Sequence, residues 1–365
     1  MRSGMKSKLR VGILGATGMV GQRFVTLLAD HPWFEVVSVA ASPNSAGKRY
    51  EDAVKDKWKM SSPIPHGVKD LIVRAVEDDL AKVAGEVDFV FCALDMDKDK
   101  IREIENSYAS ADIPVVSNNS ANRWTEYVPM IIPEINPDHV TLIDIQRKNR
   151  GWKRGLIAVK PNCSIQTYVP ILTALKAFEP REVEVVSMQA ISGAGKNFET
   201  WPEMVDNVIP YIGGEEEKSE KEPMKIWGKI SGNKIVFAKK PSISATCVRV
   251  SIADGHMAAV SVNFGMKVTK AQLIKAIQNF DNPIAKLNLP SAPKQLIKYF
   301  EEDNRPQTRL DRDFENGMGV TMGRLRPGKH FDWQFVSLSH NTIRGAAGGA
   351  ILMAELLVSK GYISQ

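Results

Sequence analysis

Cys163 has the sequence surroundings of a nucleophile. It lies in the run Pro161-Asn162-Cys163-Ser164, and the residues from Ser164 to Ala177 are compatible with a helix. We therefore predict that the thiol lies at a helix N-terminus, where the helix dipole stabilises the thiolate and lowers the thiol pKa. Such a thiolate can carry an acyl group as a thioester, which is an intermediate between an aldehyde and an activated acid.

The other two cysteines have the surroundings of buried structural residues. Cys92 stands in an apolar run, and Cys247 lies on a predicted strand. A free cysteine in such surroundings usually packs as a small hydrophobic residue. Three cysteines without a CxxC pair predict neither a disulfide framework nor a metal site, and they indicate a reducing compartment, the cytoplasm.

An arginine and a histidine occupy one predicted strand and the turn after it. Arg249 alternates with apolar neighbours, so its side chain is expected on the opposite face from theirs. Asp254-Gly255 is typical of a hairpin turn, and His256 follows directly. Arg249 and His256 can therefore face one cleft, although the local sequence leaves open whether His256 is catalytic or structural.

A glycine-rich loop near the N-terminus is typical of dinucleotide binding. Its glycines follow a predicted strand and open a predicted helix, where they permit a tight turn and let a pyrophosphate approach the backbone. The alternative is a structural turn, because the spacing alone is a weak signal. The residues predicted to contact the dinucleotide are Gly15, Thr17, Gly18, Met19, Val20 and Gly21.

The loop after the second predicted strand bears on the choice of cofactor. An NAD-binding loop places an acidic residue there to hold the ribose hydroxyls. This chain has Ser42, Ser45 and Lys48 instead, which suit a 2′-phosphate. The loop therefore favours NADP, and the alternative is that these residues only form a polar loop.

The first part of the chain alternates apolar runs with helical periods. Strands are predicted at 9–15, 34–41, 71–76, 87–94 and 113–117, and helices at 19–29 and 97–110. This alternation is typical of an α/β fold with a doubly wound parallel sheet, as in a Rossmann-type dinucleotide-binding domain.

After Cys163 the pattern changes to longer strands in which apolar and polar residues alternate. They are predicted at 183–191, 235–237, 245–252, 256–264 and 333–338, which favours a mixed or antiparallel sheet in a second, α+β domain. A final helix is predicted at 342–360, and its small residues at 345–350 indicate close packing. We expect an NADP-binding domain of residues 1–162 and 340–365 and a catalytic and oligomerisation domain of residues 163–339.

Composition limits the class of protein. The 365 residues are 43% hydrophobic and 25% charged, and the net charge of +6 comes from scattered basic residues. This argues against nucleic-acid binding, and no apolar run is long enough to cross a membrane. We interpret Met1 to Arg10 as a short polar lead into the first strand rather than a signal peptide.

The chain resembles the aspartate-semialdehyde dehydrogenases, in the branch that includes archaeal and fungal enzymes. The resemblance runs from Leu9 almost to the C-terminus, and its motifs are jointly specific. They are Gly15–Gly21, Ser42–Lys48, Ser117–Arg123, Asn162–Ser164, Gln189–Gly195, Gly213–Lys218, Arg249–His256 and Asn341–Gly345.

The resemblance implies a reaction. Aspartyl phosphate would be reduced with NADP(H) to aspartate semialdehyde through a cysteine thioester, with release of phosphate. This step belongs to the biosynthesis of lysine, threonine, methionine and isoleucine. The family also implies a homo-oligomer, either a homodimer or a homotetramer.

The resemblance also assigns roles to individual residues. The catalytic residues would be Cys163 as nucleophile, His256 as acid and base, and Gln189, which would orient the acyl group. Substrate would be held by Arg249 at the α-carboxylate, by Glu215 near the amino group, and by Arg123, Asn162 and Lys218 around the phosphate. The nicotinamide would be faced by Ser192, Gly193 and Asn341. The lysine assignment is open, because Lys218, Lys221 and Lys225 share one charged segment that could instead be a solvated helix face.

Two other functions remain open from the sequence. A malonyl-CoA reductase or an N-acetylglutamyl-phosphate reductase would use the same cysteine and histidine, but a substrate without a free amino group has no use for Glu215. A non-catalytic redox sensor that binds the dinucleotide would need a DNA-reading or partner domain, and the chain contains no basic recognition helix.

Overall fold

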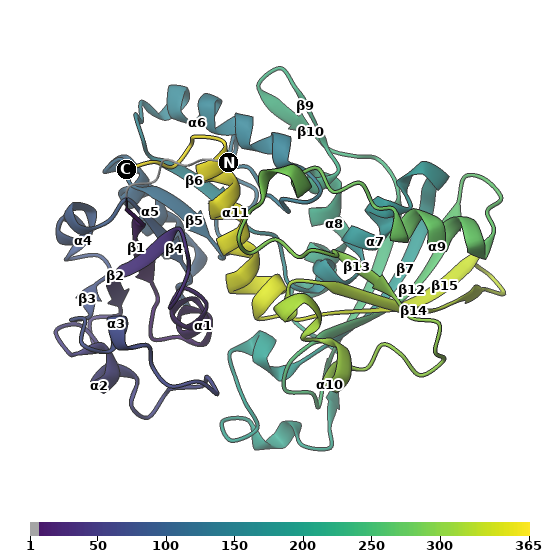
Figure 1. The fold of residues 1–365 in the computed structure, drawn as a ribbon, viewed down its shortest axis with the longest axis horizontal. Coiled ribbons are helices and arrows are strands. Elements are labelled where there is room, and N and C mark those ends of the chain that lie inside the picture. Colours follow the sequence, from purple (N-terminus) through teal and green to yellow (C-terminus); the bar gives the residue numbers. More distant parts are fainter. Residues whose placement is uncertain (1–6) are drawn as a thin grey trace.

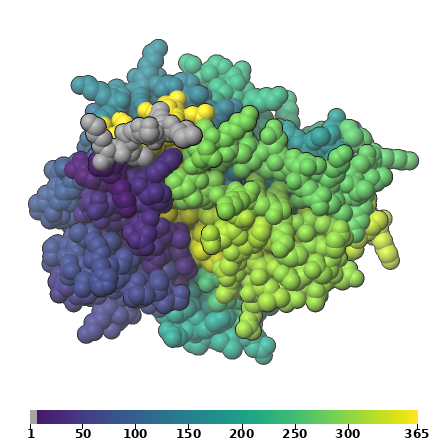
Figure 2. All heavy atoms as spheres, viewed as in Figure 1, coloured from purple at the N-terminus to yellow at the C-terminus, as the bar shows by residue number. Residues whose placement is uncertain are grey.

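The computed structural model describes residues 7–365, and the C-terminal helix lies between its two large β-sheets (Figure 1). The start of the predicted N-terminal lead, residues 1–6, lies outside the described residues. Viewed as spheres, the two halves pack against each other, and atoms of the C-terminal segment show between them (Figure 2).

The first sheet is the predicted parallel sheet. Within residues 7–365 it has six strands in the order β3-β2-β1-β4-β5-β6, the arrangement of a doubly wound dinucleotide-binding fold. The strands are β1 (Leu9–Leu14), β2 (Phe34–Ala41), β3 (Arg74–Ala75), β4 (Phe89–Cys92), β5 (Pro114–Ser117) and β6 (Leu156–Val159). The helices of this part are α1 (Met19–Leu27), α2 (Tyr50–Val54), α3 (His66–Lys69), α4 (Leu80–Glu86), α5 (Lys98–Ser110) and α6 (Leu142–Arg150).

The second sheet is mixed, as predicted. Within the described residues its order is β13-β14-β15-β12-β7-β11-β8, and β11 runs parallel to β7 while β12 runs antiparallel to it. The strands are β7 (Pro180–Gln189), β8 (Val208–Ile209), β11 (Ser242–Val250), β12 (His256–Phe264), β13 (Ile297–Tyr299), β14 (Val320–Pro327) and β15 (Trp333–Ser339). A separate hairpin is formed by β9 (Lys229–Ser231) and β10 (Lys234–Val236), so the strand predicted at 235–237 lies outside the main sheet.

Four of the remaining helices belong to the second half, and the last returns to the first. They are α7 (Val169–Ala174), α8 (Glu215–Ile226), α9 (Lys270–Gln278), α10 (Thr308–Asp311) and α11 (Gly348–Ser359). Helix α8 packs on β11, and α11 returns to pack on β5 of the first sheet. The last part of the chain therefore joins the two halves.

Strand β4 shows how the apolar core is divided. Phe89 and Phe91 point into a buried cluster that includes residues of α1 and α11. Val90 and Cys92 point into a second cluster, which continues to the second sheet. Successive side chains of a strand face opposite sides, so this continuous apolar run fits a strand that is covered on both faces.

Three expectations about local structure are wrong. The strand predicted at 71–76 is reduced to Arg74–Ala75, because this edge strand pairs only with the end of β2. The helix predicted to run from Ser164 is broken into a short 3-10 helix, Ser164–Thr167, and α7. The last helix begins as a π-helical turn, Ile343–Ala347, before α11.

The predicted hairpin at Asp254-Gly255 is also absent. In the described sheet β7 lies between β11 and β12, so the turn carries the chain across a neighbouring strand instead of joining a hairpin. Gly255 has φ +100°, a conformation that L side chains rarely adopt, which explains why a glycine stands there.

Candidate active site

The thiol of Cys163 and the imidazole of His256 meet at the centre of the molecule. The Sγ atom lies 3.3 Å from Nε2, although the residues are 93 positions apart in the chain. Cys163 follows β6 and precedes the 3-10 helix Ser164–Thr167, whereas His256 is the first residue of β12. The two sheets therefore each supply one of the two groups, as a nucleophile with its acid or base requires.

The backbone defines the tautomer of His256. The N–H of Ala190 donates to Nδ1 at 3.1 Å, so that nitrogen accepts and carries no proton. The proton of the neutral ring is thereby assigned to Nε2, the nitrogen that faces the sulfur. Burial, and then the nearby cation Arg249, hold the pKa of His256 well below 6.5, so the ring is neutral at pH 7.

The thiol pKa differs from the sequence prediction. Burial, and then the carboxylate of Glu215, raise the pKa of Cys163 above its ordinary value, while the cations Lys160, Arg123 and Arg249 act in the opposite direction. The predicted lowering by a helix dipole is wrong, because only a four-residue 3-10 helix follows the cysteine. The surrounding cations, rather than a helix, are what favour the thiolate here.

A cavity of about 220 Å³ opens in front of the thiol. Residues of both halves line it, and most of them were predicted as site residues. They are Val20, Asn118, Asn119, Ser120, Arg123, Asn162, Cys163, Ser192, Gly193, Glu215, Lys218, Asn341, Thr342, Gly345 and Ala346. Val20 of the glycine loop, the cysteine, four of the five predicted substrate residues and the predicted nicotinamide contacts thus share one space.

Arg249 lies beneath Gly193 and does not line this cavity. A Cβ built on Gly193 would come within 2.9 Å of Arg249 Nη1 and 3.1 Å of His256 Cε1, so only glycine fits over the two side chains. Arg249 is 5% exposed, and its Nη1 donates to the carbonyl of Ala190 at 2.7 Å. Arg249 and His256 lie close together, as predicted, but neither is among the residues that line this cavity.

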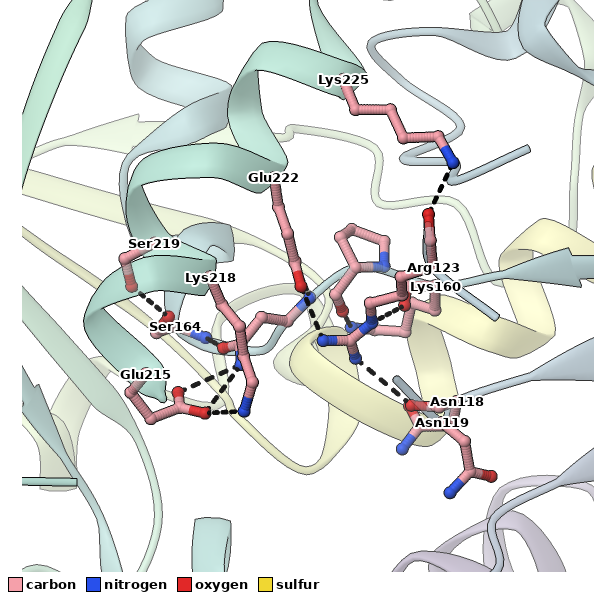
Figure 3. Close-up of polar contacts among 12 residues, drawn as sticks. Asn118, Asn119, Arg123, Lys160, Ser164, Glu215, Lys218, Ser219, Glu222 and Lys225 are labelled. Carbon is pink, nitrogen blue, oxygen red and sulfur yellow. Dashed lines mark hydrogen bonds and ion pairs between the residues drawn. The ribbon is translucent and has the colours of Figure 1, made fainter. Parts of the chain in front are cut away.

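Helix α8 presents a polar stripe to the site (Figure 3). Glu215, Ser219, Glu222 and Lys225 are buried and recur at the spacing of one helix face, so this segment is not a solvated helix face. At its start Glu215 accepts hydrogen bonds from Asn162 Nδ2 at 3.0 Å and from Lys218 Nζ at 2.7 Å.

The carboxylate of Glu215 is stabilised as an anion. Burial raises its pKa, but Lys218 and the hydrogen bonds of Asn162 and Gln189 outweigh burial, and the pKa lies below its ordinary value. Gln189 Nε2 donates to Glu215 Oε2 at 3.3 Å. A negative charge therefore stands beside the thiol, where it can pair with a substrate ammonium group.

The three lysines of this helix are separated by the structure. Lys218 lines the cavity and pairs with Glu215. Lys221 is exposed and pairs with Glu217 at 2.7 Å. Lys225 is buried and donates to the backbone carbonyls of Arg123 and Val128, and burial lowers its pKa to about 8. Lys218 is therefore the lysine placed to meet a ligand in the cavity.

The sequence interpretation missed Lys160 and Glu222. Lys160 is 2% exposed, and burial lowers its pKa to about 7, while the nearby sulfur of Cys163 acts to raise it. Glu222 is fully buried and pairs with Arg123 at 2.8 Å. The helical spacing of Glu222 to Glu215 was a signal for a shared face, but the pattern of hydrophobic residues does not reveal a polar stripe.

The glycine loop fits a dinucleotide. A Cβ on Gly15 would lie 2.3 Å from the carbonyl oxygen of Ala93, and one on Gly21 would lie 2.1 Å from that of Gly15, whereas Gly18 has room. The loop is therefore closely packed at two glycines, and α1 begins at Gly18 without a side-chain cap, which leaves its first N–H groups for a ligand.

The other predicted cofactor residues lie on either side of this loop. Ser42, Ser45 and Lys48 follow β2, which is parallel to β1 and ends at the same sheet edge. Asn341 Nδ2 donates to Ser192 Oγ at 2.8 Å beside the cavity. Within residues 7–365 there is no group of three or more acidic, histidine or cysteine side chains placed to hold a metal ion.

Two family descriptions match the two halves of the chain. Residues 10–143 match the NAD-binding domain of the semialdehyde dehydrogenases, and residues 170–344 match their dimerisation domain. Together the matches cover most of the chain. No helix in the described part of the chain is both long enough and apolar enough to span a bilayer.

Relatives match along nearly the whole chain. Aspartate-semialdehyde dehydrogenase of Archaeoglobus fulgidus is 45% identical over 97% of this chain and 99% of its own length, and that of Aspergillus fumigatus is 44% identical over 98% and 99%. The crystal structure of the Candida albicans enzyme with NADP superposes with a TM-score of 0.86 at 37% identity, covering 98% of this chain and 100% of that one. The protein belongs to the aspartate-semialdehyde dehydrogenase family.

Proposed function

We propose that the protein catalyses the NADP-dependent reductive dephosphorylation of L-aspartyl 4-phosphate to L-aspartate 4-semialdehyde, through a thioester on Cys163. The observation that carries the proposal is the contact of 3.3 Å between Cys163 Sγ and His256 Nε2, beside a cavity that is lined both by Cys163 and by Val20 of the glycine loop. The product would enter the biosynthesis of lysine, threonine, methionine and isoleucine.

The charges around the thiol support a substrate that carries an ammonium group and two kinds of anion. Arg123 and Lys218 at the cavity would hold the phosphate together with Asn162. Arg249, which lies beneath Gly193, would hold the α-carboxylate at that end of the site. An arginine can contact either anion through two nitrogens. The anionic Glu215 would meet the ammonium group, which favours aspartate over malonyl or N-acetylated substrates.

The residues of the first half suit NADP. The closely packed loop Gly15–Gly21 and the uncapped start of α1 suit a pyrophosphate, and Ser42, Ser45 and Lys48 suit a 2′-phosphate. The bound cofactor supplies the hydride for reduction. Ser192, Gly193 and Asn341 would position its nicotinamide beside the thiol, since they line the same cavity.

The mechanism follows from the two central residues. The Cys163 thiolate attacks the acyl carbon, and phosphate leaves toward Arg123 and Lys218. The neutral His256 holds its proton on Nε2, where it can share that proton with the substrate oxygen as charge develops there and recover it when the oxyanion collapses and expels phosphate or the thiolate. Gln189, which is held by Glu215, would orient the acyl group.

We further propose that the open face of the second sheet forms a homodimer interface, within a dimer or a tetramer. Along β12 buried residues alternate with half-exposed ones, and on the neighbouring β7 Val186 is 43% exposed. The family description of this region as a dimerisation domain supports the proposal.

We propose residues 1–162 and 340–365 as the NADP-binding domain and residues 163–339 as the catalytic and oligomerisation domain. We also propose that the protein is cytoplasmic, where its three free thiols would stay reduced.

The test is NADP reduction with aspartate semialdehyde, measured with and without inorganic phosphate. We expect a rate that depends on phosphate, that is higher with NADP than with NAD, and that is lost in Cys163→Ser while NADPH binding remains. Malonate semialdehyde with CoA is the comparison substrate, and a higher rate with that pair would contradict the proposal. Light scattering coupled to size-exclusion chromatography measures the molar mass, and hence the number of subunits in the oligomer.

A further inference from the structure

Glu222 makes two contacts that link separate parts of the proposed site. Its side chain is fully buried on α8. One oxygen, Oε1, accepts from Nη1 of Arg123 at 2.8 Å, and the other, Oε2, accepts from the backbone N–H of Asn162 at 2.6 Å. Figure 3 shows Glu222 reaching from the helix to the guanidinium of Arg123. A single carboxylate thus touches an arginine of the cavity and the peptide next to the nucleophile.

Both partners bear on the reaction. Arg123 is the proposed phosphate ligand, and the peptide of Asn162 immediately precedes Cys163. We infer that Glu222 is a positioning residue that holds the phosphate-binding guanidinium and the nucleophile-bearing peptide in one fixed arrangement. The inference rests on the proposed function, since it takes the role of Arg123 from there.

The guanidinium of Arg123 is fixed on three sides. Besides Glu222, its Nε donates to the carbonyl of Lys160 at 3.0 Å, and its Nη2 faces the carbonyl of Asn118 at 3.4 Å. The Arg123 side chain is 7% exposed and still reaches the cavity. A guanidinium held in this way meets an anion without reorganising, and such preorganisation is what favours binding in the transition state.

A carboxylate is needed at this position for two reasons. It offers two acceptor oxygens to two donors, whereas the amide of a glutamine offers one acceptor and would turn its NH₂ group toward an N–H. It also balances charge, because the buried cations Lys160 and Lys225 both interact with it. The isosteric change Glu222→Gln therefore breaks one contact while preserving volume.

The experiment compares Glu222→Gln with the wild-type enzyme in the direction that consumes phosphate. We expect KM for phosphate to rise about 10- to 100-fold and kcat to fall, because a displaced guanidinium and thiol lose alignment. NADPH affinity and the melting temperature report whether the variant is folded. The matched control is Glu216→Gln, on the same helix, where Glu216 accepts a backbone N–H from Cys247 at 3.2 Å.

A double-mutant cycle with Arg123→Leu tests whether Glu222 acts through the arginine. If it does, the double variant has a KM for phosphate close to that of Arg123→Leu alone, because the effects of coupled residues are not additive. Additive effects, or a Glu222→Gln variant with wild-type KM for phosphate and wild-type kcat, would overturn the inference. A wild-type enzyme without phosphate-dependent activity would instead overturn the proposed function.

Discussion

Gly345 lies directly against Cys163. A Cβ built on Gly345 would come within 2.7 Å of the cysteine Cβ, although the glycine belongs to the π-helical turn before α11. One helical turn further on, a Cβ on Gly349 would come within 2.9 Å of Lys160 Cε. The close packing that the sequence pattern indicated is present, and its small residues leave room for the nucleophile and for the cation behind it.

We predict that Gly345→Ala displaces the thiol. The added methyl group must move Cys163 or the π-helical turn, so kcat should fall about 10- to 100-fold and the free energy of unfolding should fall by about 1–3 kcal/mol. Kinetics and denaturant titration measure both. The control is Gly85→Ala in α4, where a Cβ would meet no atom within 4 Å. Wild-type kcat in Gly345→Ala would show that the thiol position is not constrained by this contact.

A second prediction separates hydrogen-bond donation by His256 from proton exchange by its ring. In His256→Gln the amide nitrogen can still donate to the sulfur from the place of Nε2, but it cannot exchange a proton. We expect kcat to fall about 10²- to 10⁴-fold in both His256→Gln and His256→Asn, with little change in substrate KM. The pH dependence of the rate of Cys163 alkylation should stay closer to wild type in His256→Gln than in His256→Asn. A variant that lost only substrate affinity would make His256 a binding residue.

The third prediction concerns Lys160, the buried cation behind the thiol. The charge of Lys160 lowers the pKa of Cys163, and the thiolate in turn raises the pKa of Lys160, so the two groups titrate as a pair. Lys160→Met should therefore move the alkylation profile of Cys163 to higher pH. The exposed Lys267→Met is the control. An unchanged profile in Lys160→Met would exclude an electrostatic role for the lysine.

Stability should respond to the same change in a defined pH window. The pKa of Lys160 is about 7 in the folded protein and 10.5 for a solvent-exposed lysine, so unfolding takes up a proton between these values. The cost of burying the charge is complete below pH 7 and fades as the pH rises toward 10.5. Lys160→Met should therefore raise the melting temperature most below pH 7, and the gain should shrink above it. Melting curves between pH 6 and 10 test the sign.

The strands were the best-predicted part of the fold. The predicted ranges 34–41 and 256–264 coincide with β2 and β12, because the first is a covered apolar run and the second alternates strictly. The edge strand β3 was overestimated, since the backbone of Leu71 and Val73 hydrogen-bonds to residues 47–50 rather than to a partner strand. Strands β13 and β14 were not predicted at all.

The site was predictable where a chemically reactive residue type stands in a recognisable motif. Cys163 and His256 lie 3.3 Å apart, and Val20 of the glycine loop lines the same cavity as Cys163. The thiol pKa was predicted in the wrong direction, because it depends on burial and on charges such as Lys160 and Glu215 that are distant in sequence. Glu222 was missed for the same reason, since its partners Arg123 and Asn162 lie 99 and 60 residues away.

The last prediction distinguishes the two arginines. The α-carboxylate stays on the substrate in both directions, whereas phosphate enters or leaves, so Arg249→Leu should raise KM for aspartate semialdehyde and Arg123→Leu should raise KM for phosphate more. Each substitution should weaken the binding of its anion by about 2–5 kcal/mol. The reason is that removing one partner of a desolvated ion pair leaves the other charge unpaired.

The two variants should also differ in stability. Arg123→Leu leaves the buried carboxylate of Glu222 without its cation, so its melting temperature should fall, and Glu222→Gln added to it should restore part of the loss. Arg249→Leu leaves a backbone carbonyl, that of Ala190, without its donor. Initial rates with each substrate varied in turn decide the assignment. If Arg123→Leu raised KM for the semialdehyde and left KM for phosphate unchanged, the roles of the two arginines would be exchanged. The phosphate-binding site would then have to lie on the other side of Gly193, beside Arg249.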